Sequence, residues 1–324
     1  MRDSIRIAVL GAGGLGKAAA KIIGMKRECR LVAICDSRGF AVDPDGLDTE
    51  AIATLTTDVV RGYRRADDPL QALLERAELY DAVFVALPNL PNAFIPSVTR
   101  RFLQRGAALV FVDVLKRTSA VEQLYALDDE VKQAGSVYLT GCGATPGLLS
   151  AAAVLAAQSF ITVESVDIWW GVGIAKWEAY QATIREDIAH LPGYTVERAK
   201  ALSDAEVTAL LDQTDGKLEL HHMEHADDLL LERVGVVESR DQVEVGGVMD
   251  TRHAKKPVTT TMTLTGITFE GQRASHRFQL GDETTMAANV IGPALGYLKR
   301  GCWLKERGIF GVFGCTEVMP MVMR

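Results

Sequence analysis

The chain has 324 residues, of which 48% are apolar and 24% charged, so it can bury a sizeable core and form about two domains of typical size. The net charge of −7 argues against a nucleic-acid partner, and the longest apolar run, residues 148–157, is too short to span a bilayer. Five scattered cysteines without a C-x-x-C pair fit a reducing cytoplasm, and no signal-peptide pattern precedes the first expected strand.

A glycine-rich turn follows the first expected strand, residues 5–10. Gly11, Gly13 and Gly16 have the G-x-G-x-x-G spacing, in which the first glycine permits a tight turn, the second lets a pyrophosphate approach and the third lets helix and strand pack closely. A helix starting there directs backbone N–H groups and its positive end at an anion. The alternative is an ordinary glycine-rich turn. The predicted cofactor contacts in this turn are Gly11, Ala12, Gly13, Gly14, Leu15 and Gly16.

The second expected strand, residues 31–35, ends at an acidic residue. Asp36 lies twenty positions after Gly16, where a carboxylate accepts hydrogen bonds from the adenosine ribose of a dinucleotide. Asp36 disfavours a 2′-phosphate by charge repulsion, whereas Arg38 can pair with one. With Asp36, Ser37 and Arg38 as predicted cofactor contacts, the sequence favours NAD over NADP.

The rest of the first 145 residues alternates helix and strand. A Gly-, Pro- and Asp-rich stretch at 39–48 is expected to be a surface loop, and Ser119 with Glu122 has the spacing of a capping box. The alternation predicts a Rossmann domain over residues 1–145, with a doubly wound parallel sheet. Further strands are expected at 82–87, 107–112 and 137–140, and helices at 69–77, 94–104 and 119–134.

After residue 145 the regular alternation of helix and strand ends. Residues 146–286 are predicted to form a second α+β domain with a mixed or antiparallel open sheet, for substrate binding and dimer contacts. A helix over 285–299 is expected to close at Gly301, and residues 287–324 are expected to pack back on the first domain. In the second domain we expect strands at 163–171, 217–224, 242–249, 258–265 and 273–280, with a hairpin turn at Glu270-Gly271. Helices are expected at 177–188 and at 203–212, where Ser203 and Glu206 have the spacing of a capping box.

Ligands of open parallel sheets bind beyond the carboxyl ends of the strands. We therefore expect the nicotinamide near the last three of these ends, at residues 87–92, 113–118 and 141–147. The predicted cofactor contacts there are Leu87, Pro88, Asn89 and Asp113. Lys116, just past the same strand as Asp113, can hold a substrate carboxylate or donate a proton. Asp113 and Lys116 are the catalytic candidates, and the alternative is a solvated loop with ordinary charges.

Five residues are candidate substrate contacts: Asn92, Cys142, Thr145, Trp170 and Arg185. Each of three could instead have a purely structural role, because free cysteine often packs in a core, tryptophan is usually buried and arginine usually lies on the surface. His221, His222, Glu224 and His225 could suggest a metal site. However, neighbouring residues of a strand face opposite sides and no H-E-x-x-H pattern is present, so we expect a solvated sheet end and no metal.

The run from Thr140 to Gly147, TGCGATPG, resembles the G-C-G-x-x-P-G passage of saccharopine dehydrogenase-like oxidoreductases. The wider order is similar to meso-diaminopimelate dehydrogenase: a strand ending near Asp113, this junction, a small-residue helix and a W-G-x-G stretch at 170–173. A leucine-proline-glycine element at 191–193 and Thr316-Glu317-Val318 are also similar.

This resemblance implies a Rossmann domain with a mixed-sheet domain, a homodimer, and hydride transfer between NAD or NADP and the C–N bond of a small, carboxylate-bearing amino or imino acid. The chain departs from the diaminopimelate enzymes at Asn92, where they have an acidic contact, at Cys142, where they have tryptophan, and at Asp36, where they have a basic cluster. The substrate therefore stays open. The alternatives are a dehydrogenase of alcohols or polyols and a non-catalytic NAD(P)H-binding sensor or scaffold.

Overall fold

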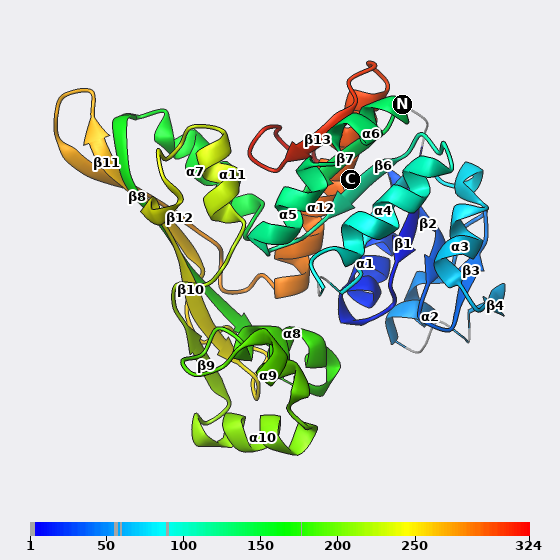
Figure 1. Ribbon diagram of the computed structural model, residues 1–324, viewed down its shortest axis with the longest axis horizontal. Helices are drawn as coiled ribbons and strands as arrows, with labels where there is room; N and C mark the ends of the chain where they lie inside the picture. The colour runs from blue at the N-terminus through cyan, green and yellow to red at the C-terminus, as the bar shows by residue number, and fades with distance from the viewer. Residues whose placement is uncertain (1–3, 55–57, 59, 89–90, 176) are drawn as a thin grey trace. The chain divides into compact units, whose positions relative to one another are not determined.

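A computed structural model describes residues 4–54, 58, 60–88, 91–175 and 177–324 (Figure 1). The chain divides into two compact units, the first comprising Met1–Leu148 with Ala287–Arg324 and the second Leu149–Met286. Within the described ranges, no helix is both long and apolar enough to cross a membrane.

The first unit is built on an eight-stranded sheet in the order β13-β7-β6-β5-β1-β2-β3-β4. The strands from β13 to β2 are parallel to their neighbours, whereas β3 and β4 are antiparallel. The central strands carry almost only buried side chains, as expected for a sheet covered on both faces. The strands are β1 (Ile5–Leu10), β2 (Cys29–Cys35), β3 (Gly39–Val42), β4 (Tyr63–Arg65), β5 (Ala82–Val85), β6 (Val110–Asp113), β7 (Val137–Thr140) and β13 (Gly311–Gly314).

The helices of this unit agree with the expected order but not always with the expected ends. Asp68 caps α3 as its position before Pro69 suggests, accepting a hydrogen bond from Gln71 N at 2.9 Å. The Ser119 capping box is wrong, because α5 already begins at Thr118 and no side chain caps it. The helices are α1 (Gly14–Gly24), α2 (Thr49–Thr54), α3 (Pro69–Leu74), η2 (Ala77–Leu79), α4 (Phe94–Gln104), α5 (Thr118–Tyr125), α6 (Asp128–Gln133) and α12 (Met286–Lys305).

The second unit contains a five-stranded mixed sheet in the order β12-β11-β8-β10-β9, in which only the β8–β10 pair is parallel within the described residues. The expected hairpin at Gly271, whose φ is +75°, joins β11 and β12. Its strands are β8 (Phe160–Gly173), β9 (Lys217–Leu220), β10 (Val243–Asp250), β11 (Thr261–Thr268) and β12 (Arg273–Gln279). Its helices are α7 (Leu148–Ala157), η3 (Trp177–Tyr180), α8 (Gln181–Ile188), α9 (Val196–Ala201), α10 (Asp204–Gln213), α11 (Asp227–Arg233) and η4 (Arg240–Gln242). The predicted fold class, a Rossmann sheet plus a mixed-sheet α+β unit, is confirmed.

Two expectations about glycine-containing segments are wrong. Gly39 does not open a surface loop, because β3 is a largely buried strand that pairs with β2. Gly301 does not close α12, which runs on to Lys305. A Cβ at Gly301 would lie 2.5 Å from Val110 Cγ1, so this glycine instead lets α12 approach the sheet closely.

Candidate functional site

The turn between β1 and α1 has the geometry that its three glycines predict. Gly11 has a φ of +99°, and a Cβ there would lie 2.5 Å from the carbonyl oxygen of Ala86. A Cβ on Gly16 would lie 1.9 Å from the carbonyl oxygen of Gly11, so the helix can pack on the turn only without a side chain. A Cβ on Gly13, in contrast, would have nothing within 4 Å. The turn is therefore tightly packed at Gly11 and Gly16, and it has free space at Gly13, where an anion would approach.

The first turn of α1 can accept an anion electrostatically. No side chain caps the helix at Gly13, and its first turn contains no acidic residue. The backbone N–H groups and the positive end of the helix dipole are therefore not opposed by a carboxylate of this turn. Gly14 and Leu15, like Ala12, are half-buried in this segment.

Asp36 follows β2 and is fixed by its neighbours. Its Oδ1 accepts hydrogen bonds from Arg38 N at 2.7 Å, Gly39 N at 2.9 Å and the hydroxyl of Tyr63 at 3.1 Å. The Arg38 guanidinium is 4.0 Å from Asp36 Oδ2 and 3.6 Å from the carboxylate of Asp58, and its side chain is 56% exposed. Both the carboxylate that suits a ribose and the cation that suits a 2′-phosphate thus stand at this strand end, with Ser37 exposed between them.

The loops after β5 and β6 meet through a side-chain contact. Arg117 is only 7% exposed, and its Nε donates to Asn92 Oδ1 at 3.1 Å. Lys116, next to Arg117, is half-buried. Of the predicted nicotinamide contacts after β5, Leu87 is half-buried and Pro88 is exposed, while Asn89 lies outside the described residues.

Asp113 has a structural position rather than an exposed one. It is 0% exposed, and its Oδ1 accepts hydrogen bonds from Leu115 N at 3.0 Å, Gly141 N at 2.8 Å and Thr140 Oγ1 at 3.1 Å. Burial raises the pKa of the Asp113 carboxyl to about 6, although these hydrogen bonds oppose the rise. Through these bonds Asp113 holds the ends of β6 and β7 together, and its catalytic and cofactor contacts stay predictions.

The junction after β7 is compact. Gly147 has a φ of +130°, and a Cβ there would lie 1.9 Å from the carbonyl oxygen of Gly143. Cys142 is 0% exposed, and burial raises the pKa of its thiol well above the ordinary value. The burial of Cys142 agrees with the packing alternative, and its substrate contact stays a prediction. Thr145 is half-buried in the loop. The expected helix start at Pro146 is wrong, because α7 begins at Leu148.

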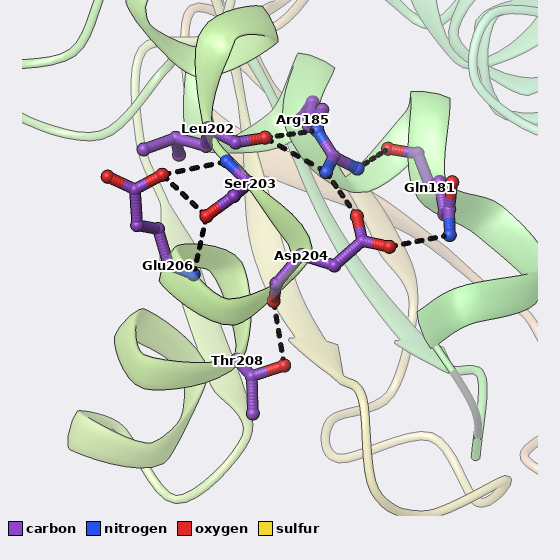
Figure 2. A network of polar contacts seen from close by, with 7 residues as sticks. All are labelled: Gln181, Arg185, Leu202, Ser203, Asp204, Glu206 and Thr208. Atoms are coloured by element: carbon purple, nitrogen blue, oxygen red, sulfur yellow. Dashed lines mark hydrogen bonds and ion pairs between the residues drawn. The ribbon is translucent and has the colours of Figure 1, made fainter.

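Two substrate candidates of the second unit also have structural contacts. Trp170 is 7% exposed, and a Cβ on Gly247 would lie 2.3 Å from its ring, so Trp170 packs directly on β10. Figure 2 shows Arg185 between α8 and the start of α10, where Nε and Nη2 donate to the carbonyl oxygen of Leu202 at 3.2 and 3.0 Å. Nη2 also donates to Asp204 Oδ1 at 2.5 Å. This network favours a structural role for Arg185 over binding a substrate carboxylate.

The histidine-rich segment before α11 differs from the expected solvated sheet end. The side chains of His221 and His222 are 54% and 84% exposed, but His225 is only 3% exposed and contacts Asp227. In the part of the chain that the structure describes, no group of three or more His, Cys, Asp or Glu residues is arranged to hold a metal ion. No periodic pattern in the sequence indicates the burial of His225. Its partner Asp227 is held by Ser150, which lies 77 residues away in the chain.

Comparison with solved structures shows that this fold, a Rossmann sheet with a second mixed-sheet unit, is shared with known dehydrogenases. Diaminopimelate dehydrogenase of C. glutamicum in complex with diaminopimelate is 18% identical, with a TM-score of 0.60 over 98% of this chain and 94% of that one. An engineered D-amino acid dehydrogenase bound to NADP⁺ is 17% identical, with a TM-score of 0.59 over 97% and 94%. The family model of glutamate/leucine/phenylalanine/valine dehydrogenase matches residues 2–99.

A curated relative defines the family more narrowly. The (S)-8-amino-7-oxononanoate synthase BioU of Haloferax mediterranei is 42% identical, and the match covers 98% of this chain and 99% of that protein. The chain belongs to the BioU family.

Proposed function

We propose that this protein is an NAD(P)-dependent oxidoreductase that acts on the C–N bond of a carboxylate-bearing amino ketone or diamine, of the size of 8-amino-7-oxononanoate. The open space at Gly13, between the tightly packed Gly11 and Gly16, carries the proposal. It leaves room for a pyrophosphate at the uncapped first turn of α1. A bound nicotinamide supplies or accepts a hydride.

The name of the relative and the fold can be reconciled by one reaction. Its product has a ketone at C7 and an amine at C8. A dehydrogenase that oxidises one amine of the vicinal diamine would form this amino ketone: R₂CH–NH₃⁺ + NAD(P)⁺ + H₂O gives R₂C=O + NH₄⁺ + NAD(P)H + H⁺. The reverse direction is a reductive amination. A hydride transfer therefore accounts both for the family name and for the Rossmann domain.

The residues of this chain would bind and orient the substrate. We propose that half-buried Lys116 and buried Arg117, after β6, supply positive charge for the substrate carboxylate, since both follow the strand end at which a nicotinamide would lie. Asn92 would act by holding Arg117. Asp113 would position this loop through its bonds to Leu115 and Gly141.

The choice of cofactor depends on two neighbouring side chains. The fixed carboxylate of Asp36 supports NAD, because it can accept hydrogen bonds from the ribose hydroxyls. The exposed guanidinium of Arg38 supports NADP, because it can pair with a 2′-phosphate. We propose a reducing, cytoplasmic location and a homodimer; the five free cysteines support the former, and the resemblance to the diaminopimelate enzymes the latter.

The test is a titration of the protein with NADH and NADPH, followed by assays with the vicinal diamine and with the amino ketone plus ammonium. We expect cofactor binding, NAD(P)H formation from the diamine and release of ammonium. An alcohol or polyol dehydrogenase would instead reduce the amino ketone to an amino alcohol with consumption of NAD(P)H but not of ammonium, and a sensor would bind the cofactor without turnover. Absence of binding to either dinucleotide would contradict the proposal.

A matched pair of variants distinguishes an effect on cofactor binding at the turn from a general effect on the stability of the fold. Gly13→Ala places a methyl group in the open space, at a φ of −73° that any residue adopts. We expect unchanged thermal unfolding and an increase of the NAD(P)H dissociation constant of at least about tenfold. Gly292→Ala, in α12, also adds a methyl group with nothing within 4 Å, and should leave the dissociation constant unchanged.

A further inference from the structure

The acidic residue after β2 is bonded into the same part of the fold as the glycine turn. Gly11 N donates to the carbonyl oxygen of Cys35 at 3.1 Å, so the turn after β1 is joined to the residue before Asp36. Asp36 N in turn donates to the carbonyl oxygen of Gly39 at 3.0 Å, which closes the short connection to β3. The two predicted cofactor contacts, the turn and the carboxylate, therefore lie side by side within the first unit.

The two oxygens of the Asp36 carboxylate have different environments. Oδ1 accepts hydrogen bonds from Arg38 N at 2.7 Å and Gly39 N at 2.9 Å, and a third from the Tyr63 hydroxyl at 3.1 Å. Among the described residues, the only hydrogen bond to Oδ2 is a long one of 3.4 Å from the same hydroxyl. A carboxylate oxygen has about two lone-pair sites. The protein therefore saturates Oδ1, whereas Oδ2 keeps the capacity to accept hydrogen bonds from a ligand.

Tyr63 reaches Asp36 because the Rossmann sheet has an antiparallel extension. β4, at the edge of the sheet, pairs with β3 so that Tyr63 is opposite Ala41 and Arg65 is opposite Gly39 (Figure 1). The tyrosine side chain lies diagonally over Gly39, where a Cβ would be 2.7 Å from the hydroxyl oxygen. The absence of a side chain at Gly39 thus leaves room for the contact between Tyr63 and Asp36.

We infer that Tyr63 sets the cofactor specificity of this site by positioning Asp36, so that the protein prefers NAD to NADP. The inference rests on the dinucleotide binding proposed above. A carboxylate fixed in this way can accept hydrogen bonds from the ribose hydroxyls of NAD, whereas its charge would repel a 2′-phosphate. Without the tyrosine hydroxyl, Asp36 can turn toward the guanidinium of Arg38, which is 4.0 Å from Oδ2, and the discrimination between the two cofactors weakens. Tyr63 is therefore a positioning residue.

Another tyrosine of the first unit has a hydroxyl with a purely structural bond. Tyr80 is 2% exposed, and its hydroxyl donates to the carbonyl oxygen of Leu73 in α3 at 2.8 Å. This bond lies between two neutral groups and includes none of the predicted cofactor contacts. The half-buried Tyr63 instead donates to an ionisable side chain at the end of a parallel strand, where a charge-assisted bond fixes the acceptor more firmly.

The decisive variant is Tyr63→Phe in the full-length protein, titrated with NADH and with NADPH. It removes only the hydroxyl that holds Asp36. We expect the wild-type protein to bind NADH more tightly than NADPH, and the variant to lose at least about fivefold of this preference, mainly through weaker NADH binding. Tyr80→Phe is the matched control. It also removes one hydroxyl from the first unit, and it should lower the temperature of unfolding without changing the preference.

A double-mutant cycle distinguishes positioning of Asp36 from an independent effect of Tyr63. Asp36→Asn keeps the shape of the side chain but removes its charge, so it should by itself reduce the preference for NADH. Adding Tyr63→Phe to Asp36→Asn should then change the ratio of the two dissociation constants by less than about twofold. An equally large effect of Tyr63→Phe with and without the carboxylate overturns the positioning role.

A second measurement does not depend on the cofactor, and it remains available if Tyr63→Phe does not fold. Burial and the hydrogen bond to Asp36 raise the pKa of the Tyr63 hydroxyl; the charge of Asp58 adds to the rise, and Arg38 opposes it. A ¹³C NMR titration of protein with labelled tyrosine should therefore show a lower pKa for Tyr63 in Asp36→Asn than in the wild type. The same pKa of Tyr63 in both proteins overturns the inference, because the contact would then not form in solution.

The outcomes separate this inference from the proposed function. A wild-type protein that binds NADPH at least as tightly as NADH overturns the inference, and so does a Tyr63→Phe variant that keeps the wild-type preference. Neither result contradicts the proposed amine oxidation, which either cofactor can support. A wild-type protein that binds neither dinucleotide overturns both.

Discussion

The turn at residues 11–16 and the segment at 221–227 show how differently two candidate sites are encoded. In the turn, the essential property is backbone geometry: a positive φ at Gly11, a close approach at Gly16 and open space at Gly13. In the segment, the essential property is a contact between side chains of distant elements, Ser150 in α7 and Asp227 in α11. A backbone site is local and can be predicted from spacing, whereas a contact between side chains of distant elements depends on tertiary packing.

The largest effect should come from closing the backbone site. Gly16→Val would place a side chain 1.9 Å from the carbonyl oxygen of Gly11, so β1 and α1 would have to move apart. We expect a loss of about 3 kcal/mol in the free energy of unfolding and no detectable NAD(P)H binding, measured by urea denaturation and titration. A stable variant that binds NAD(P)H normally would contradict this account, because cofactor binding would then not require the close approach of α1 to the turn.

The buried carboxyl of Asp113 should produce the next largest effect. Its pKa is raised to about 6 in the folded protein, so the folded state binds a proton more tightly than the unfolded chain. Its contribution to stability is thus fully present below about pH 4 and is lost as the pH rises to about 6, by roughly 2–3 kcal/mol.

The neutral variant Asp113→Asn should abolish this pH dependence. The difference in unfolding free energy between wild type and variant, from urea denaturation at several pH values, should change between about pH 4 and pH 6 and stay constant above pH 7. A difference independent of pH would contradict a raised pKa. Unchanged NAD(P)H binding by Asp113→Asn would indicate that Asp113 positions the loop and does not contact the cofactor.

A smaller effect is expected for the network in Figure 2. Arg185→Ala removes bonds to the carbonyl oxygen of Leu202 and to Asp204, and should lower the free energy of unfolding by about 1–2 kcal/mol. We expect the KM of the substrate to stay within about twofold, because the guanidinium serves the fold. A tenfold rise of KM without loss of stability would instead restore Arg185 as a carboxylate contact.

The smallest effect should be on cofactor selectivity. Arg38 is exposed, so Arg38→Ala should weaken NADPH binding only about three- to tenfold, and leave NADH binding unchanged. Parallel titrations with the two dinucleotides measure this ratio. Equal weakening of both would mean that Arg38 acts through the Asp36 carboxylate rather than on a 2′-phosphate.

The sequence predicted those features that depend on local chemistry. The Ser203–Glu206 capping box is confirmed, with both reciprocal hydrogen bonds, and so is the start of a helix at Pro69. The central strands were recognisable because each is a short apolar run buried on both faces. The alternation of these runs with helices predicted the parallel sheet.

The errors arose where tertiary packing outweighed a local signal. Gly301 looked like a helix end, but α12 needs it for close contact with Val110. Ser119 looked like a cap, but α5 starts one residue earlier. Asp113 follows a predicted strand, and its burial is a further feature that no local pattern indicates. Spacing locates a strand end, but it does not say which side chains there face outward.

The most direct test of the central claim is the transfer of an isotope. The protein is incubated with the amino ketone, ammonium and NAD(P)H that carries deuterium on C4 of the nicotinamide, and the product is analysed by mass spectrometry and NMR. The account predicts a diamine with one deuterium on the carbon that has gained nitrogen. A diamine without deuterium, from either face-labelled cofactor, would contradict hydride transfer to the C–N bond.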